Sequence, residues 1–308
     1  MIDRSVAVGT VRLPSPVVAA SGTAGHGAEL SAYGDLADLG AVVVKSLSAE
    51  PWEGNAAPRV HAAAGGAAML NSVGLQGPGV EAWRRHDLPP MLAAGARVVG
   101  SIWGRTVDDY AKAAAAMAGA ELVALEINLS CPNLDGGRHL FAQSPEDSGA
   151  VVASVRDAVG DLPVWAKLTA VTGSLVDVAA AAVAAGASAV TLVNTLLGMV
   201  IDVERRTYAL GSEPGGGGLS GPAIHPVAVR AVHDVHAALP EVPIVGLGGV
   251  TSGVDAVELL LAGASAVGVG TATFADPRAC WRIQDELVHW CEDHDIPTIA
   301  ELTGAIHA

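Results

Sequence analysis

The chain has 308 residues, a formal net charge of -15 at pH 7 and a sequence pI near 4.9. This acidity disfavours binding to nucleic acid or to an anionic membrane surface. The three cysteines, Cys131, Cys280 and Cys291, lack C-x-x-C spacing, which argues against a disulfide framework or a cysteine-held iron–sulfur centre. No signal-peptide pattern or membrane-spanning apolar run is present, and the histidines show no metal-ligand pattern. We therefore expect a soluble, cytoplasmic protein without a metal site.

Apolar runs of strand length alternate with alanine-rich helical segments along the chain. The predicted strands are Pro16–Ser21, Ala41–Leu47, Ala96–Ile102, Leu122–Leu129, Pro163–Leu168, Ala189–Asn194, Pro243–Leu247 and Ala266–Val269. The predicted helices are Val107–Ala118, Pro145–Val159, Leu175–Ala185, Pro226–Leu239, Gly253–Ala262 and Arg278–Cys291. Eight β–α units in a chain of this length predict an α/β fold, the closed (β/α)8 TIM barrel. The absence of G-x-G-x-x-G after the first strand disfavours a dinucleotide-binding sheet.

Two insertions interrupt the alternation. The first runs from Ala49 to about Gly79, and the second from Leu196 to Ile224 with four consecutive glycines, Gly215–Gly218. Long glycine-rich insertions at the C-terminal face of a barrel are typical of a mobile lid or a ligand-contacting loop. Because no linker or shift in composition appears, residues 1–308 are predicted to form a single domain.

The stretch from Glu126 to Phe141, E-I-N-L-S-C-P-N-L-D-G-G-R-H-L-F, is the strongest candidate for the chemistry. It begins as a buried strand and breaks into a polar cluster, which is where α/β enzymes hold reactive groups. Amide side chains can read a planar ring that carries donors and acceptors, and the thiol of Cys131 can move a proton.

Polar and glycine residues also follow nearly all of the remaining predicted strands. They should therefore meet at one mouth of the barrel. The last two strands end in V-G-L-G-G-V-T-S and V-G-V-G-T-A-T-F, where backbone N–H groups can hold a phosphate. Lys45 and Lys167 end the second and fifth strands. Together these features indicate a phosphorylated ring cofactor, and flavin mononucleotide (FMN) fits, since a cation stabilises its reduced ring.

With these features, the chain resembles a known family, the class 1 dihydroorotate dehydrogenases, and most closely subclass 1B. The resemblance covers nearly the whole length, and its most specific element is N-L-S-C-P-N followed by G-G-x-x-x-F. The other matching segments, in order, are A-S-G-T, V-V-V-K-S-L, M-L-N-S-V-G-L-Q, N-T-L-L-G-M, G-G-L-S-G-P-A-I-H-P and G-L-G-G-V.

The resemblance implies oxidation of (S)-dihydroorotate to orotate in pyrimidine (UMP) biosynthesis, with Cys131 as the base and one FMN per chain accepting hydride at N5. The residues implied to hold the substrate are Lys45, Asn71, Ser72, Val73, Gly74, Leu75, Asn128, Asn194 and Thr195. Those implied to hold FMN are Ser21, Lys45, Ser46, Ser101, Asn128, Lys167, Val193, Gly221, Gly248, Gly249, Gly270 and Thr271.

Subclass 1B further implies a homodimer core within a heterotetramer, whose partner subunit carries FAD and a [2Fe–2S] cluster and passes electrons to NAD⁺. The chain departs from the family pattern at Ser101, where asparagine is common, at Ala24, where an aromatic is usual, and at His225, where lysine is common. The shorter side chain of Ser101 puts its contact with the flavin in question.

Three alternatives remain open. One is a fumarate-dependent enzyme of subclass 1A, and another is a related FMN-dependent dihydropyrimidine dehydrogenase acting on uracil, thymine or tRNA uridines. Lys45 and Asn71 favour a substrate carboxylate, which uracil lacks, and the acidic surface argues against tRNA. The third is a barrel without catalytic activity, which would bind no flavin.

Overall fold

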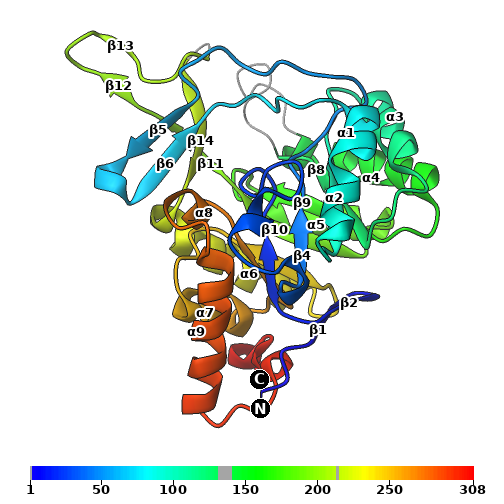
Figure 1. Cartoon of the computed structure of the whole chain (residues 1–308), viewed down its shortest axis with the longest axis vertical. Helices are drawn as coiled ribbons and strands as arrows, with labels where there is room; N and C mark the ends of the chain where they lie inside the picture. The colour runs from blue at the N-terminus through cyan, green and yellow to red at the C-terminus, as the bar shows by residue number, and fades with distance from the viewer. Residues whose placement is uncertain (1, 131–140, 213–214) are drawn as a thin grey trace.

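Eight parallel strands close into a barrel in a computed structural model, which describes residues 2–130, 141–212 and 215–308 (Figure 1). Around the barrel the strands run in the order β3, β4, β7, β8, β9, β10, β15, β16, and β16 pairs with β3. They span Val17–Ala19, Ala41–Val43, Val98–Ile102, Ala124–Asn128, Val164–Thr169, Ala189–Asn194, Ile244–Leu247 and Ala266–Val269. All eight predicted strands are present, which confirms the (β/α)8 fold.

The barrel strands form because their residues are small, apolar or β-branched and are covered on both faces. Every residue of β7, β8, β9 and β16 is buried. Pairing in register, as between Val99 and Ala124 or Leu125 and Val164, aligns the C-terminal ends of the strands. The polar residues that follow those ends therefore surround one opening.

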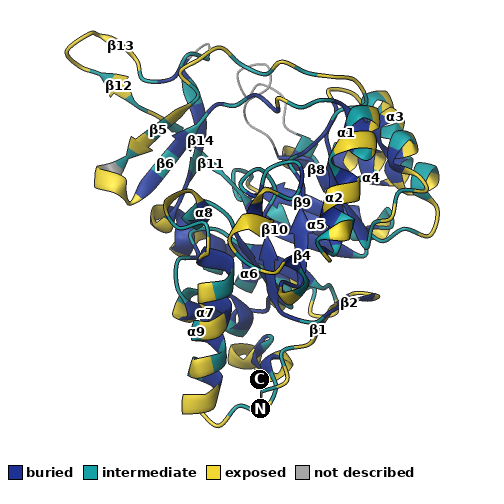
Figure 2. Cartoon of the chain, viewed as in Figure 1, coloured by how far each residue is buried: buried dark blue, intermediate teal, exposed yellow. Residues whose placement is uncertain are grey.

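The six predicted helices are confirmed, each within two residues at its ends. They are α3 (Val107–Met117), α4 (Pro145–Val159), α5 (Leu175–Ala184), α6 (His225–Ala238), α7 (Gly253–Leu261) and α9 (Ala279–Asp293). Thr106 and Ser252 begin α3 and α7 with capping boxes. The helices turn their buried sides to the strands and their exposed sides outward (Figure 2). Cys280 and Cys291 are both fully buried in α9, as expected for core packing.

Three further helices were not predicted: α1 (Val80–His86), α2 (Leu88–Ala93) and α8 (Ala272–Ala275). Short 3₁₀ turns occur at Glu29–Ala32, Leu36–Asp38, Ala64–Gly66, Phe141–Gln143, Pro222–Ile224, Ile299–Leu302 and Ala305–His307. None of the helices within the described ranges is long and apolar enough to cross a bilayer.

The two insertions fold together into an antiparallel sheet of four strands, which we call the cap sheet. Its order is β5 (Val60–Ala63), β6 (Ala68–Asn71), β14 (Gly216–Ser220) and β11 (Leu196–Met199). A small hairpin, β12 (Ile201–Asp202) and β13 (Thr207–Tyr208), projects beyond it (Figure 1). The glycine-rich segment that we predicted as a lid or ligand-contacting loop is therefore largely a strand.

Both termini of the chain lie at the end of the barrel opposite the cap sheet (Figure 1). A hairpin of β1 (Val6–Val8) and β2 (Val11–Leu13) buries its apolar side chains there. The backbone N–H of Asp3 donates to the carbonyl of Pro297 at 2.9 Å, and that of Ile299 donates to the carbonyl of Asp3 at 3.0 Å.

Candidate active site at the barrel mouth

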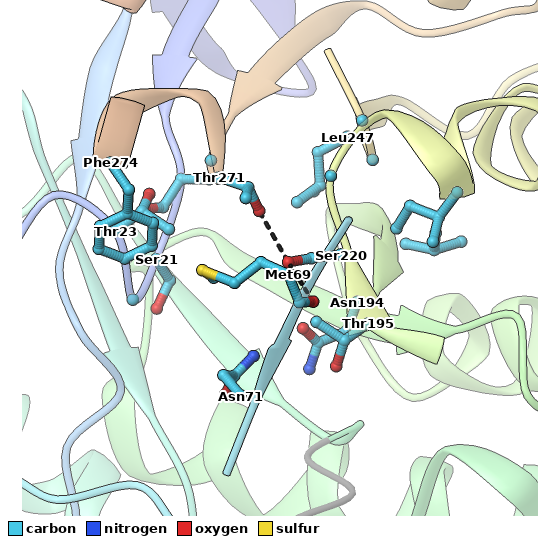
Figure 3. Close-up of a pocket in the computed structure, with 18 of the residues that line it drawn as sticks. Ser21, Thr23, Met69, Asn71, Asn194, Thr195, Ser220, Leu247, Thr271 and Phe274 are labelled. Atoms are coloured by element: carbon cyan, nitrogen blue, oxygen red, sulfur yellow. Dashed lines mark hydrogen bonds between the residues drawn. The ribbon is translucent and has the colours of Figure 1, made fainter. Parts of the chain in front are cut away.

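A pocket lies at the C-terminal ends of the barrel strands, where the cap sheet covers part of the opening. The empty space of the pocket, together with the solvent in its open mouth, amounts to about 1080 Å³. Side chains from β6, β10, β14 and the segments after β3 and β16 point into the same space (Figure 3). The predicted convergence of the strand ends is therefore present.

Most of the predicted site residues line this pocket. From the substrate set these are Lys45, Asn71, Val73, Gly74, Leu75, Asn128, Asn194 and Thr195. From the FMN set these are Ser21, Lys45, Ser46, Asn128, Lys167, Val193, Gly221, Gly248, Gly249, Gly270 and Thr271.

Two predicted residues, Ser72 and Ser101, are fully buried behind the pocket wall. Ser72 follows Asn71 at the end of β6, and its hydroxyl accepts a hydrogen bond from Asn55 at 2.8 Å. The alternation of side chains along a strand sends Ser72 away from the cavity that Asn71 faces. Ser101 is too short to pass Ser46, and their hydroxyl oxygens lie 2.9 Å apart. Contacts of these two residues with a ligand remain predictions.

Ser46 is the centre of a polar network that crosses the pocket floor. Its hydroxyl accepts from Asn128 Nδ2 at 3.1 Å and lies 3.4 Å from Ser21 Oγ. Ser21 in turn donates to the carbonyl of Val44 at 2.7 Å. The network joins the ends of β3, β4, β7 and β8, so it fixes the side chains that face the pocket.

A buried ion pair lies beside this network. Lys167 Nζ is 3.7 Å from Glu126 Oε1, and their side chains are 5% and 2% exposed. The Ser101 hydroxyl donates to the same carboxylate oxygen at 3.5 Å. Because a buried charge requires a partner, Glu126 allows Lys167 to remain a cation at the pocket floor.

The polypeptide immediately before Cys131 is held from two sides. Asn194 Nδ2 donates to the carbonyl of Ser130 at 3.2 Å, and the Ser130 N–H donates to Asn128 Oδ1 at 3.3 Å. Tyr110 of α3 donates to the carbonyl of Asn128 at 2.7 Å. Cys131 itself, the predicted base, lies outside the described residues. The contacts of Asn128 and Ser130 fix the backbone that directly follows β8.

Comparison with known proteins identifies the family. The sequence profile described as dihydroorotate dehydrogenase matches residues 4–290. The chain belongs to the dihydroorotate dehydrogenase family. Members of this family are flavin-dependent. The resemblance predicted from the motifs is confirmed.

Relatives of this dihydroorotate dehydrogenase family member match it over nearly their whole length. The three described next carry the same name, dihydroorotate dehydrogenase B (NAD(+)), catalytic subunit. The protein from Desulforudis audaxviator is 45% identical over 99% of this chain and 98% of its own. Those from Alkaliphilus metalliredigens and Geobacter sulfurreducens are 43% and 40% identical, covering 99% of this chain and 99% and 98% of their own.

Several pocket residues of this dihydroorotate dehydrogenase chain were not singled out from the sequence, including Met69, Ser220 and Phe274. Met69 stands two residues before Asn71 on β6, so the two-residue period of a strand places both side chains on the same face. Ser220 accepts a hydrogen bond from Thr271 at 2.8 Å, which joins the cap sheet to the segment after β16 (Figure 3). The period of β6 was the usable signal for Met69.

The pocket wall exposes backbone that a flavin phosphate could approach. Gly221, Gly248, Gly249 and Gly270 line the wall without side chains, so an anion can approach the main chain closely. Gly248 and Gly249 have φ angles of 138° and 71°, which favour glycine. An added Cβ on Gly248 would lie 2.6 Å from Ala228 Cβ. This open backbone and the cation of Lys167 on the floor fit FMN.

Proposed function

We propose that this chain oxidises (S)-dihydroorotate to orotate in de novo pyrimidine (UMP) biosynthesis. Family membership supports the reaction. The observation that carries the site assignment is the convergence of three amides, Asn71, Asn128 and Asn194, with Lys45 in a single pocket. A six-membered ring with alternating carbonyl and N–H groups requires such donors and acceptors.

The substrate carboxylate would be held by Lys45 and by the backbone around Gly74 and Leu75, all of which line the pocket. Asn71 and Asn194 come from the cap sheet and from β10, so they approach the ring from different elements. This arrangement discriminates orotate from uracil, because uracil has no carboxylate to pair with the cation.

One FMN per chain would lie across the mouth, with its phosphate near Gly248, Gly249, Gly270 and Thr271 and its pyrimidine end near Lys167. When bound, FMN supplies the acceptor for the hydride that leaves C6. Lys167 would stabilise negative charge at that end of the ring. Ser21 and Ser46 would orient the ring from below through the floor network.

Cys131 would act as the base, taking the C5 proton as the C5–C6 bond becomes double. A free thiol has a pKa of roughly 8.5, so it needs assistance to ionise near neutrality. The hydrogen bond from Asn194 to the carbonyl of Ser130, the residue before Cys131, supports this role because it ties a proposed substrate residue to the neighbouring backbone. By contrast, burial raises the pKa of Cys280 to about 12, which leaves that thiol inert.

The proposal extends to a partner subunit carrying FAD and a [2Fe–2S] cluster, which would pass electrons to NAD⁺ in the cytoplasm within a heterotetramer around a homodimer core. The relatives' names describe catalytic subunits of NAD(+) enzymes. Exposed apolar side chains also support a docking surface: Val60 and Phe274 at the pocket, and Leu197, Met199, Ile201, Val203 and Tyr208 on the cap sheet and hairpin.

The deciding experiment is dihydroorotate oxidation by the purified chain with an artificial dye, NAD⁺ or fumarate offered separately. Turnover with the dye alone supports the partner-dependent enzyme. Efficient turnover with fumarate would contradict the partner proposal and indicate subclass 1A. A flavin spectrum that responds to uracil but not to orotate would indicate a dihydropyrimidine enzyme instead.

The role of Cys131 has its own test. Cys131→Ala should lower turnover by about 100-fold to 10,000-fold, the usual contribution of a general base, while FMN stays bound. Cys291→Ala is the matched control because Cys291 lies in α9, outside the pocket lining. Equal turnover in the two variants would exclude Cys131 as the base.

A further inference from the structure

His225 begins helix α6 and lies directly behind the pocket wall. It is only 8% exposed and does not itself line the pocket. Its Nδ1 is 2.8 Å from the carbonyl oxygen of Gly248, and its Nε2 is 3.1 Å from Glu258 Oε2. A second carboxylate oxygen, Asp255 Oδ1, lies 4.0 Å from Nε2.

Both ring nitrogens of His225 therefore face oxygen acceptors. The carbonyl of Gly248 cannot donate, and an ionised Glu258 cannot donate either. The ring of His225 therefore bridges the carbonyl of Gly248 and the carboxylate of Glu258 on α7.

The turn that His225 holds is the glycine pair at the end of β15. An added Cβ on Gly249 would lie 2.8 Å from His225 Cβ and 2.9 Å from its backbone nitrogen, so the turn packs directly on the histidine. The following residues are fixed from α7, because Asp255 Oδ2 accepts from the Thr251 N–H and hydroxyl, both at 2.8 Å. The backbone from Gly248 to Thr251 thus has a rigid support on the side away from the pocket.

We infer that His225 is a positioning residue for phosphate binding: its ring holds the Gly248–Gly249 turn in place from behind the pocket wall. The inference rests on the FMN site proposed above. Among the described residues, the charged groups that face the ring within 4.0 Å are Asp255 and Glu258, both on α7. Removing the imidazole would remove the contact with the carbonyl of Gly248 and would weaken the binding of the phosphate.

The test compares FMN with riboflavin, which lacks the phosphate, in equilibrium titrations of the apoprotein. The measurements run from about pH 7 upward, where a phosphate monoester is already mostly dianionic. His225→Gln removes the ring that bridges Gly248 and Glu258, and should weaken FMN binding by about threefold to tenfold, the range for a lost hydrogen bond. Riboflavin affinity should stay the same.

Equal FMN affinities in the unchanged protein and His225→Gln would overturn the inference, as would an equal loss for riboflavin. If the unchanged protein binds no FMN, the proposed function fails instead. Ring ¹⁵N shifts of His225, assigned by their absence in His225→Lys, give a readout that does not depend on how well His225→Gln folds. An Nδ1 shift that stays the same when FMN binds would contradict the coupling of the ring to the Gly248–Gly249 turn.

Discussion

The pairing of Lys167 with Glu126 shows how one residue, Glu126, determines the charge of the pocket floor. Two charges removed from water are costly, and their attraction offsets that cost only with a close partner and further hydrogen bonds. Ser101 supplies one such bond to Glu126. The serine at this position therefore supports the ion pair from behind the wall.

Replacing Glu126 with glutamine should lower the free energy of unfolding of the apoprotein by about 3–5 kcal/mol, because Lys167 would remain buried without a counter-charge. Chemical denaturation measures this loss. The control is Asp108→Asn, which breaks an exposed 2.6 Å pair with Lys112 and should cost less than about 1 kcal/mol. Similar losses in both variants would mean that the buried pair is not held as ions.

Strand β14 shows what a glycine-rich element contributes to the site. It lies between β6 and β11 and carries Gly216 to Ser220. The carbonyl of Gly218 accepts from Asn71 at 3.3 Å, and the Thr195 side chain fills the space where a Cβ on Gly218 would lie. The absence of a side chain at Gly218 thus sets the positions of two proposed substrate residues.

Gly218→Ala should therefore displace Thr195 and weaken orotate binding by about tenfold or more, since small misplacements at a binding site are costly. Gly216→Ala is the matched control on the same strand, because its nearest neighbour would be the carbonyl oxygen of Gly198 at 3.6 Å. Orotate titration followed by the flavin absorbance measures both. Unchanged affinity in Gly218→Ala would argue against a role for Thr195.

The elements also show what the sequence can and cannot predict. The barrel strands and six helices were predictable because burial and local periodicity coincide in them. Helix α2 was missed because Pro89 and Pro90 resemble a loop, although proline suits the first turn of a helix. The cap sheet was missed because it depends on pairing between β6 and β14, which are far apart in the sequence. The hydrogen bond from Asn71 to Gly218 joins residues that are 147 positions apart. No local pattern encodes such a pairing.

The positions of the site residues were also predictable in part. Residues at strand ends, such as Lys45 and Asn128, were expected at the mouth because parallel strands align those ends. Whether a side chain reaches the pocket or stays buried behind its wall was not predictable, as Ser72 and Ser101 show. It depends on the direction in which the strand presents the side chain and on which neighbour lies in front of it.

At the scale of the whole molecule, two partly buried histidines, His26 and His236, link stability to pH. Burial, followed by the charge of Lys45, lowers the pKa of His26. Burial, followed by His307 and His233, lowers the pKa of His236, whose Nδ1 has no hydrogen-bond partner among the described residues. Both histidines are therefore neutral in the folded protein under conditions where the unfolded chain already binds protons.

The contribution of the two histidines to stability should therefore be fully present above the unfolded histidine pKa of about 6.5. It should decrease as the pH falls below that value and level off once the folded forms are protonated. The lowered pKa of Asp255 affects stability only at a more acidic pH, since its contribution is lost as the pH falls through the folded value. Unfolding free energies measured between about pH 7.5 and about pH 5 test this. Combining His26→Gln with His236→Gln should flatten the curve, and an unchanged slope would contradict the assignment.

The meeting of Asp3 with Pro297 and Ile299 has a practical consequence. Both chain ends lie at the face of the barrel opposite the pocket, so a tag, a fusion partner or a solid support attached at either end stays clear of the mouth (Figure 1). An enzyme tethered to an electrode in this way would direct its pocket and the exposed apolar side chains of the cap sheet toward the solution. Immobilisation by the ends is therefore compatible with access for both a small substrate and a protein electron carrier.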